Sequence, residues 1–254
     1  MTILRASLVA AAALALASAA YGAYPGTYAQ LGAMGSIGVT SSGADTSVSR
    51  GTSSVVLHGA YGIPTLITTG TQLGLSHDRS QFVLQSMNQK RTSFVVLRTS
   101  DLRVMQTISL KGSFAFDALS PNARTLYLIE HRSTDLQHYV VRAYDLQARQ
   151  LLPGRIADKT QKAWVMQGWP TSRVATADGR WVYTLYTNPG GYPFVHALDT
   201  VRGVAHCVGM GWKGSQNPLY HYRLAVSGSR LLVLAPDGSV YRTINRTTWA
   251  VSLR

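Results

Sequence analysis

The chain has 254 residues, of which 46% are hydrophobic and only 14% are charged, a composition typical of a packed globular protein that excludes an intrinsically disordered chain. Its 24 lysines and arginines outnumber its 11 acidic residues, and most of the basic residues are arginine. Arginine makes planar, two-pronged contacts with carboxylate and phosphate groups, so the charge favours an anionic partner. The alternative is a general arginine bias of a high-GC genome, with the charge scattered over the surface, because the longest basic run is Lys90-Arg91.

Residues 1–19 have the layout of a secretory signal peptide. A basic residue, Arg5, precedes an alanine-rich apolar run that ends at the small-x-small site Ala17-Ser18-Ala19. The apolar run is shorter than the about 20 residues that a helix needs to cross a bilayer. We therefore predict cleavage after Ala19, a mature chain with no transmembrane segment, and a secreted or extracytoplasmic location in a bacterial envelope.

The mature chain divides into an arm and one domain. Residues 20–51 are rich in Gly, Ser, Thr and Ala and offer little apolar area, so we expect a flexible arm there. Residues 52–254 are expected to form a single domain, separate from the arm. Cys207 is the sole cysteine, so no disulfide can form within the chain and the domain depends on its core.

Repeats are the strongest signal in the chain. Four segments each place a Ser or Thr, a turn and an apolar strand in the same order, at residues 74–85, 118–130, 175–186 and 225–236. Each is followed by a partner strand that ends in an Asp or Asn, at Asp101, Asp145, Asp199 and Asn245, with spacings of 44, 54 and 46 residues. This period is typical of propeller blades. Such side chains often cap a turn through backbone amides, which explains these residues without a functional role.

Two stretches resemble a known repeat. The stretch VYTLYTN…PFVHALDTVRGVAHCVGM, residues 182–210, resembles the YVTN repeat, in which a VYVTN strand precedes VSVIDT and VVATI strands. The segment SPNARTLYLIE, residues 120–130, resembles the SPDG-x-x-LYV turn and strand of the same repeat. Over residues 63–251 the chain is thus similar to the WD40/YVTN-like β-propeller superfamily, and most closely to secreted bacterial members of unknown function.

The resemblance implies an all-β propeller with little or no helix. Four full blades are visible in the sequence, and we expect a partial N-terminal blade built from residues 47–59. Because the superfamily includes surface-layer proteins and lactonases as well as proteins of unknown function, the resemblance implies an architecture but not a chemistry.

One polar cluster is predicted at the centre of the propeller. When the innermost strands are aligned on the Ser or Thr before the turn, Asp117 falls opposite Arg173, and Arg223 lies within one register step of both. A carboxylate between two guanidinium groups in the central funnel is a candidate ligand site. The same residues equally suit a structural salt bridge that closes the channel.

The segment 153–170 is longer than a connection between blades requires. Trp164, Met166 and Trp169 in this segment are a candidate exposed patch for contact with carbohydrate or protein. The alternative is that they cover the edge of a blade.

These features favour a secreted, non-catalytic propeller, expected to be a monomer, that binds a partner in the cell envelope, either a protein or an anionic cell-wall polymer. No cofactor, metal site or specific nucleic-acid partner is predicted, since no corresponding motif is present. An enzyme of lactonase or hydrolase type, with its site in the central funnel, is the first alternative. A structural surface-layer component is the second.

Overall fold

The computed structural model of the chain describes residues 23–24, 27–30, 35–42, 44–66, 71–86, 90–132, 134, 136–158 and 165–253. The predicted signal peptide, residues 1–19, lies outside the described residues, and so does Trp164. In the described part of the chain the regular elements are β-strands, apart from one 3-10 turn, η2 (Asn217–His221). No helix among these residues is long and apolar enough to cross a bilayer.

The strands form five antiparallel sheets, which we number 1 to 5 in chain order. Sheet 1 contains β2 (Thr27–Gln30), β3 (Ser36–Ser42), β4 (Asp45–Arg50) and β5 (Ser53–His58). Sheet 2 contains β6 (Tyr61–Leu66), β8 (Gln81–Ser86), β9 (Arg91–Arg98) and β10 (Val104–Lys111), with the short strands β1 (Ala23–Tyr24) and β7 (Thr71–Gln72) paired to β6.

The remaining three sheets repeat this four-stranded order. Sheet 3 contains β11 (Phe114–Leu119), β12 (Thr125–His131), β13 (His138–Asp145) and β14 (Gln150–Leu151), with β15 (Met166–Gln167) paired to β13. Sheet 4 contains β16 (Pro170–Ala175), β17 (Trp181–Tyr186), β18 (Phe194–Asp199) and β19 (Val204–Gly209). Sheet 5 contains β20 (Arg223–Ser227), β21 (Arg230–Leu234), β22 (Val240–Asn245) and β23 (Val251–Leu253).

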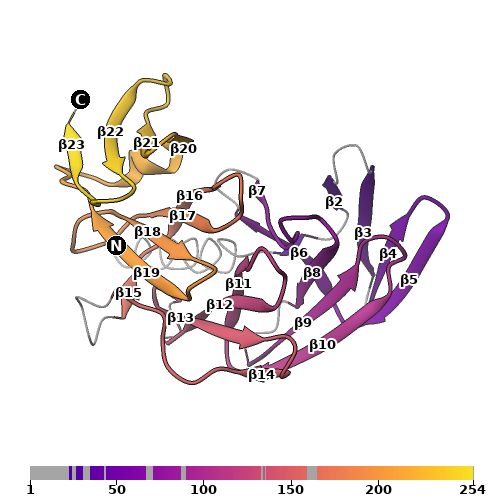
Figure 1. Cartoon of the computed structure of the whole chain (residues 1–254). Helices are drawn as coiled ribbons and strands as arrows, with labels where there is room; N and C mark the ends of the chain where they lie inside the picture. Colours follow the sequence, from indigo (N-terminus) through magenta and orange to yellow (C-terminus); the bar gives the residue numbers. More distant parts are fainter. Residues whose placement is uncertain are drawn as a thin grey trace, which may run out of the picture.

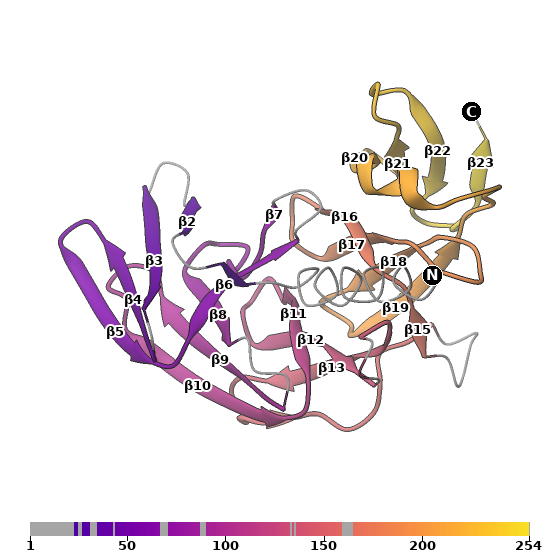
Figure 2. The same ribbon diagram turned by 180° about the vertical axis from the view of Figure 1, so that it is seen from behind.

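The sheets follow one another in an arc, with sheets 1 and 5 at its two ends in both views (Figures 1 and 2). The first strands of sheets 2 and 4, β6 and β16, contact each other near the middle of the arc. The prediction of an all-β propeller with little helix is therefore confirmed.

The core lies between the sheets. Four buried apolar clusters are each shared by two consecutive sheets, represented by Val48 with Phe82, Phe94 with Leu128, Ile129 with Leu198, and Val195 with Leu231. Strands β6, β11 and β18 are buried along their whole length, because a sheet in the arc is covered on both faces. None of the four clusters in the described residues joins sheet 5 to sheet 1.

The N-terminal part of the chain differs from the prediction. Within residues 20–51, where we expected a flexible arm, the structure forms β2, β3 and β4, and sheet 1 is a four-stranded sheet instead of a partial blade from residue 47. The small residues alternate with Ile37, Val39 and Val48, which are buried against sheet 2. The hydroxyl of Thr46, also buried, donates to the carbonyl of Gly59 at 2.7 Å. These few buried side chains order a segment that we expected, from its composition, to be flexible.

The repeated turns have the predicted chemistry. In sheets 2, 3 and 4 a hydroxyl before the first turn accepts the backbone amide that follows the turn, at 2.9 Å in each case: Ser76 from Gln81, Ser120 from Thr125 and Thr176 from Trp181. The expected caps of the later turn are also present, since Asp101, Asp145, Asp199 and Asn245 each accept turn amides. These turns give successive sheets the same register.

Replacing Leu126 by Ala tests the radial packing. Leu126 is fully buried between sheets 2 and 3, so Leu126→Ala is expected to lower the free energy of unfolding by about 2–5 kcal/mol, measured by urea denaturation. Val56→Ala is the control, because Val56 is 60% exposed and its truncation is expected to change stability by less than about 0.5 kcal/mol. Equal stability of the two variants would contradict this packing.

Candidate functional site

The predicted central cluster is present in part, as a buried ion pair between sheets 3 and 4. The Arg173 guanidinium on β16 donates through Nη2 to Oδ1 of Asp117 on β11 and through Nη1 to the backbone carbonyl of Asp117. Its Nε donates to the hydroxyl of Thr184 at 2.9 Å. The side chains of Asp117 and Arg173 are only 2% and 6% exposed. The pair is therefore enclosed and joins two sheets, as the structural interpretation predicts.

Arg223 does not join this pair. Asp117 and Arg173 each stand three residues before the turn residues Ser120 and Thr176, whereas Arg223 stands four before Ser227. A shift of one residue turns a side chain to the other face of a strand, and Arg223 is accordingly exposed. The equivalent position is occupied by Leu224, whose amide donates to the Ser172 hydroxyl at 3.0 Å.

A polar row continues from Arg173 across sheet 4, and the sequence did not indicate it. Strand register places Arg173, Thr184, His196 and Cys207 side by side on one face of the sheet. His196 is 1% exposed, and its burial lowers the pKa of the imidazole to about 4. Nδ1 of His196 lies 3.6 Å from Sγ of Cys207, and burial raises the pKa of that thiol. The His196 end of this row is therefore uncharged and buried, next to the charged Arg173.

The residues of the predicted patch in the segment 153–170 do not form one exposed surface. Met166 is 2% exposed and packs in the cluster between sheets 3 and 4, and its strand β15 extends the edge of sheet 3. Trp169 is half-buried and lines a cleft of about 340 Å³ together with Tyr220. Met166 therefore covers a sheet edge, while Trp169 borders a cavity that a ligand can enter.

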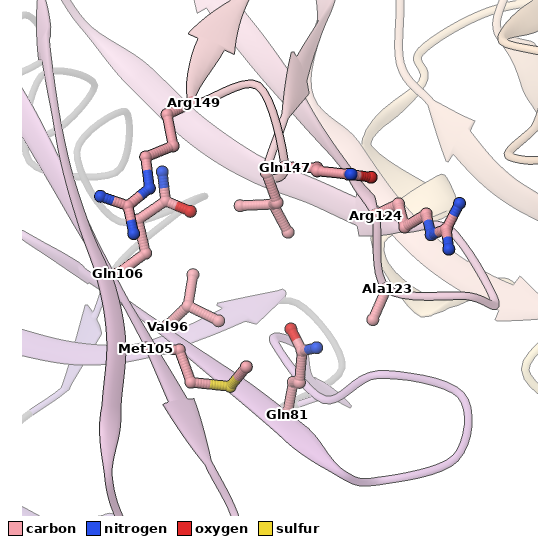
Figure 3. Close-up of a pocket in the computed structure, with 9 residues that line it drawn as sticks. Gln81, Val96, Met105, Gln106, Ala123, Arg124, Gln147 and Arg149 are labelled. Carbon is pink, nitrogen blue, oxygen red and sulfur yellow. The ribbon is translucent and has the colours of Figure 1, made fainter.

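A second cavity, of about 390 Å³, lies between sheets 2 and 3 (Figure 3). Arg124 belongs to the turn before β12, Gln147 and Arg149 belong to the turn before β14, and Gln81 and Gln106 come from β8 and β10. In Figure 3 Arg149 lies beside Gln106 on one side of the cavity, and Arg124 lies near Gln147 on the other. In the described part of the chain neither guanidinium is in an ion pair, unlike Arg98, Arg142, Arg173 and Arg180.

The cavity belongs to a larger basic surface. In every antiparallel sheet of this order the first and third turns lie at the same end. In sheets 2 to 5 each of these turns contains an arginine, except the first turn of sheet 5, which is followed directly by Arg230 at the start of β21. These eight residues define what we call the arginine face: Arg79, Arg103, Arg124, Arg149, Arg180, Arg202, Arg230 and Arg246. The ends of different sheets meet there, because a Cβ on Gly179 of sheet 4 would lie 2.9 Å from His77 of sheet 2.

The acidic residues of the same turns are Asp78, Asp101, Asp145, Asp178 and Asp199, five against eight arginines. Each of the five accepts at least one hydrogen bond from a backbone amide of its own turn. The arginine face therefore has a surplus of positive charge. The arginines are far apart in the sequence, but they lie at the same ends of the sheets. The repeat pattern contained these arginines, but only the stacking of the sheets shows that they share a face.

Comparison with known proteins finds only distant similarity to solved structures. No protein-family profile matches the chain, and no curated protein matches it. Similar solved structures include a putative 6-phosphogluconolactonase from Bacteroides uniformis, at 16% identity over 92% of this chain and 70% of that one, with a TM-score of 0.49. Others are hydrazine synthase from Kuenenia stuttgartiensis, at 18% identity over 70% of this chain and 46% of that one with a TM-score of 0.45, and TolB from Acinetobacter baumannii, at 13% identity over 82% and 53% with a TM-score of 0.39.

The chain spans about half the length of the hydrazine synthase and TolB chains. At these identities and TM-scores the likeness says nothing about activity. The β-propeller architecture stands on the five repeated sheets and the four clusters between them.

Removing the cation of the central pair is expected to destabilise the protein. Arg173→Met leaves the Asp117 carboxylate buried without its partner, so the free energy of unfolding should fall by about 3–5 kcal/mol in urea denaturation. The double variant Asp117→Asn/Arg173→Met contains no buried charge and should recover part of this loss. A single variant within about 1 kcal/mol of the parent, below the cost of an unpaired buried charge, would show that the pair does not hold the two sheets.

The buried imidazole predicts a pH dependence of stability. The pKa of His196 is lowered from 6.5 to about 4 by burial, with Asp117, Arg173 and Asp158 as the charged groups that act on it. The unfolded chain therefore binds the proton more readily. The contribution of neutral His196 to the free energy of unfolding is fully present above pH about 6.5. About 3 kcal/mol of it is lost as the pH falls from about 6.5 to about 4.

Urea midpoints measured across this pH range test the assignment. His196→Gln, which cannot titrate, is expected to flatten the curve. An unchanged slope in the variant would mean that another group carries the dependence.

Proposed function

We propose that the protein is a secreted, non-catalytic β-propeller that binds an anionic protein or an anionic cell-wall polymer in the bacterial envelope through the arginine face. The observation that carries this proposal is the cavity of Figure 3, which is lined by Arg124 and Arg149, neither of them in an ion pair in the described part of the chain, and by three glutamines. Secretion is proposed from the leader-like layout of residues 1–19, and assignment to the WD40/YVTN-like superfamily from the resemblance of residues 120–130 and 182–210.

The chemistry of the cavity suits carboxylate or phosphate groups. A guanidinium presents N–H groups in a fixed planar fork, and its hydrogen bonds to an anion are about twice as strong as those between neutral groups. Arg124 and Arg149 come from two different turns and lie on two sides of the cavity, so they suit two successive anionic groups of a polymer (Figure 3). The glutamine side chains offer both donors and acceptors to the parts of the ligand that carry no charge.

The surrounding face supports a polymer over a small anion. Six further arginines at the same ends of the sheets extend the positive charge beyond the cavity, so a long anion gains from contacts on several sheets. We propose a monomeric binding protein without specific preference for nucleic acid, since one chain already presents the whole face.

The alternative of a hydrolase-type site in the central funnel has less support. A catalytic carboxylate must be within hydrogen-bond reach of its substrate. Asp117 is 2% exposed and its Oδ1 accepts from Arg173, so the central acidic group is engaged in the fold. Cys207 is no better suited, because burial raises the pKa of its thiol and the thiolate is the reactive form.

Neutralising the cavity should weaken binding of anionic polymers. Polygalacturonate and polyphosphate are the probes, titrated by calorimetry at low and physiological salt, together with sedimentation of isolated bacterial envelopes. Arg124→Gln/Arg149→Gln is expected to lower the affinity by about tenfold or more, since each lost hydrogen bond to a charged group costs about 1.5–3 kcal/mol. Binding by the parent protein should weaken as salt is raised.

The matched control is Arg91→Gln/Arg223→Gln, which removes the same charge from exposed positions at the starts of β9 and β20, the opposite ends of the sheets. It should bind nearly as the parent does. Equal losses in the two double variants would mean that total charge alone governs binding. A single-stranded DNA probe that competes as well as the polymers would overturn the choice of partner.

A further inference from the structure

The cleft beside Trp169 differs in chemistry from the arginine face. It is lined by Trp169, Thr187, Pro189, Gln216, Asn217 and Tyr220. These residues come from three segments: the turn before β16, the loop after β17, and the connection between β19 and β20 that contains η2. Those segments lie at the ends of the strands opposite the first and third turns, so the cleft is separate from the arginine face.

The walls of the cleft are held together by hydrogen bonds between the loops. The side-chain oxygen of Gln216 accepts from the Asn188 amide at 2.7 Å, and its Nε2 donates to the carbonyls of Asn188 and Gly191 at 3.0 and 2.8 Å. The amide of Thr187 donates to the carbonyl of Trp169 at 2.9 Å. A cleft fixed in this way loses little conformational entropy when a ligand binds.

Glycine is required at the base of one wall. Gly168 has a φ of +124°, and a Cβ there would lie 1.6 Å from the carbonyl oxygen of Thr187. Only a residue without a side chain lets the backbone before Trp169 approach the end of β17 so closely. The close approach places Trp169 beside the start of the loop after β17.

The groups left for a ligand are aromatic rings and neutral polar atoms. In the described part of the chain, no side-chain hydrogen bond of Trp169, Asn217 or Tyr220 is recorded, and none of the lining residues is charged. Tyr220 is 37% exposed. An aromatic ring offers a flat apolar face with a polar edge, and an amide offers both a donor and an acceptor.

We propose that this cleft binds a neutral pyranose unit of a glycan. A pyranose ring has one apolar face of C–H groups, which suits stacking on Trp169 or Tyr220, and a rim of hydroxyls, which suits the Asn217 amide and the Tyr220 phenol. The volume of about 340 Å³ fits a monosaccharide or disaccharide, at the lower end of the about 300–1,000 Å³ found for ligand pockets. The site is uncharged and independent of the anionic partner proposed above.

Calorimetric titration with glucose, N-acetylglucosamine, cellobiose and chitobiose tests this assignment. The parent protein is expected to bind at least one of these sugars with an affinity that does not change between low and high salt. Trp169→Ala and Tyr220→Ala should each lower that affinity about tenfold or more. Tyr220→Ala is the second variant because Tyr220 is exposed and its truncation leaves the core intact.

Two controls separate this site from the arginine face. Tyr192→Ala removes a ring that is 65% exposed in the same loop after β17 but does not line the cleft, so it should bind sugar as the parent does. Arg124→Gln/Arg149→Gln should also retain sugar binding, and Trp169→Ala should retain binding of polygalacturonate. No sugar binding by the parent, or binding that survives both cleft variants, would overturn the proposal and leave the proposed function untouched.

Discussion

The structure depends on apolar burial between neighbouring sheets. Each of the four clusters takes residues from two consecutive sheets, so no sheet has a core of its own. The chain contains no disulfide, and Cys207 itself packs against the cluster between sheets 3 and 4. Stability therefore resembles that of a stack, in which each unit is held by its neighbours. The two cavities described above are lined largely by the turns and connections at the ends of this stack.

Polar side chains fix how one sheet sits on the next. Thr46 of sheet 1 accepts the amide of Tyr61 at 2.8 Å, Gln85 of sheet 2 accepts the amide of Phe116 at 2.8 Å, and Ser172 of sheet 4 accepts that of Leu224. The Asp117–Arg173 pair makes the same kind of connection between sheets 3 and 4. Apolar contacts allow sheets to slide, whereas a buried hydrogen bond has one position. These bonds determine which turns become neighbours, and hence the shapes of both cavities.

Local chemistry and one contact between sheets, the Asp117–Arg173 pair, were predictable from the sequence where it repeats, and the other contacts between sheets were not. The turn hydroxyls and caps followed from residue type and spacing, and the same spacing brought Asp117 opposite Arg173. The prediction that Arg223 joins this pair was wrong, because Arg223 stands one residue further from its turn and its side chain therefore lies on the other face of the strand. Sheet 1 was missed because composition does not show that Ile37 and Val48 meet the apolar face of sheet 2. His196 was missed because its polar neighbours lie on other strands.

The two ends of the sheets differ because the lengths of their connections are constrained to different degrees. The third turns are short and capped, so their length and register repeat, and an arginine in the repeat becomes a row of arginines in space. The connections at the other end vary in length, so the one containing η2 can place Gln216 and Tyr220 beside Trp169 without a counterpart in other sheets. A short sugar cannot reach both ends. If both proposals hold, one partner that occupies both sites must be long enough to pass around the edge of the arc and must carry acidic groups as well as a neutral sugar.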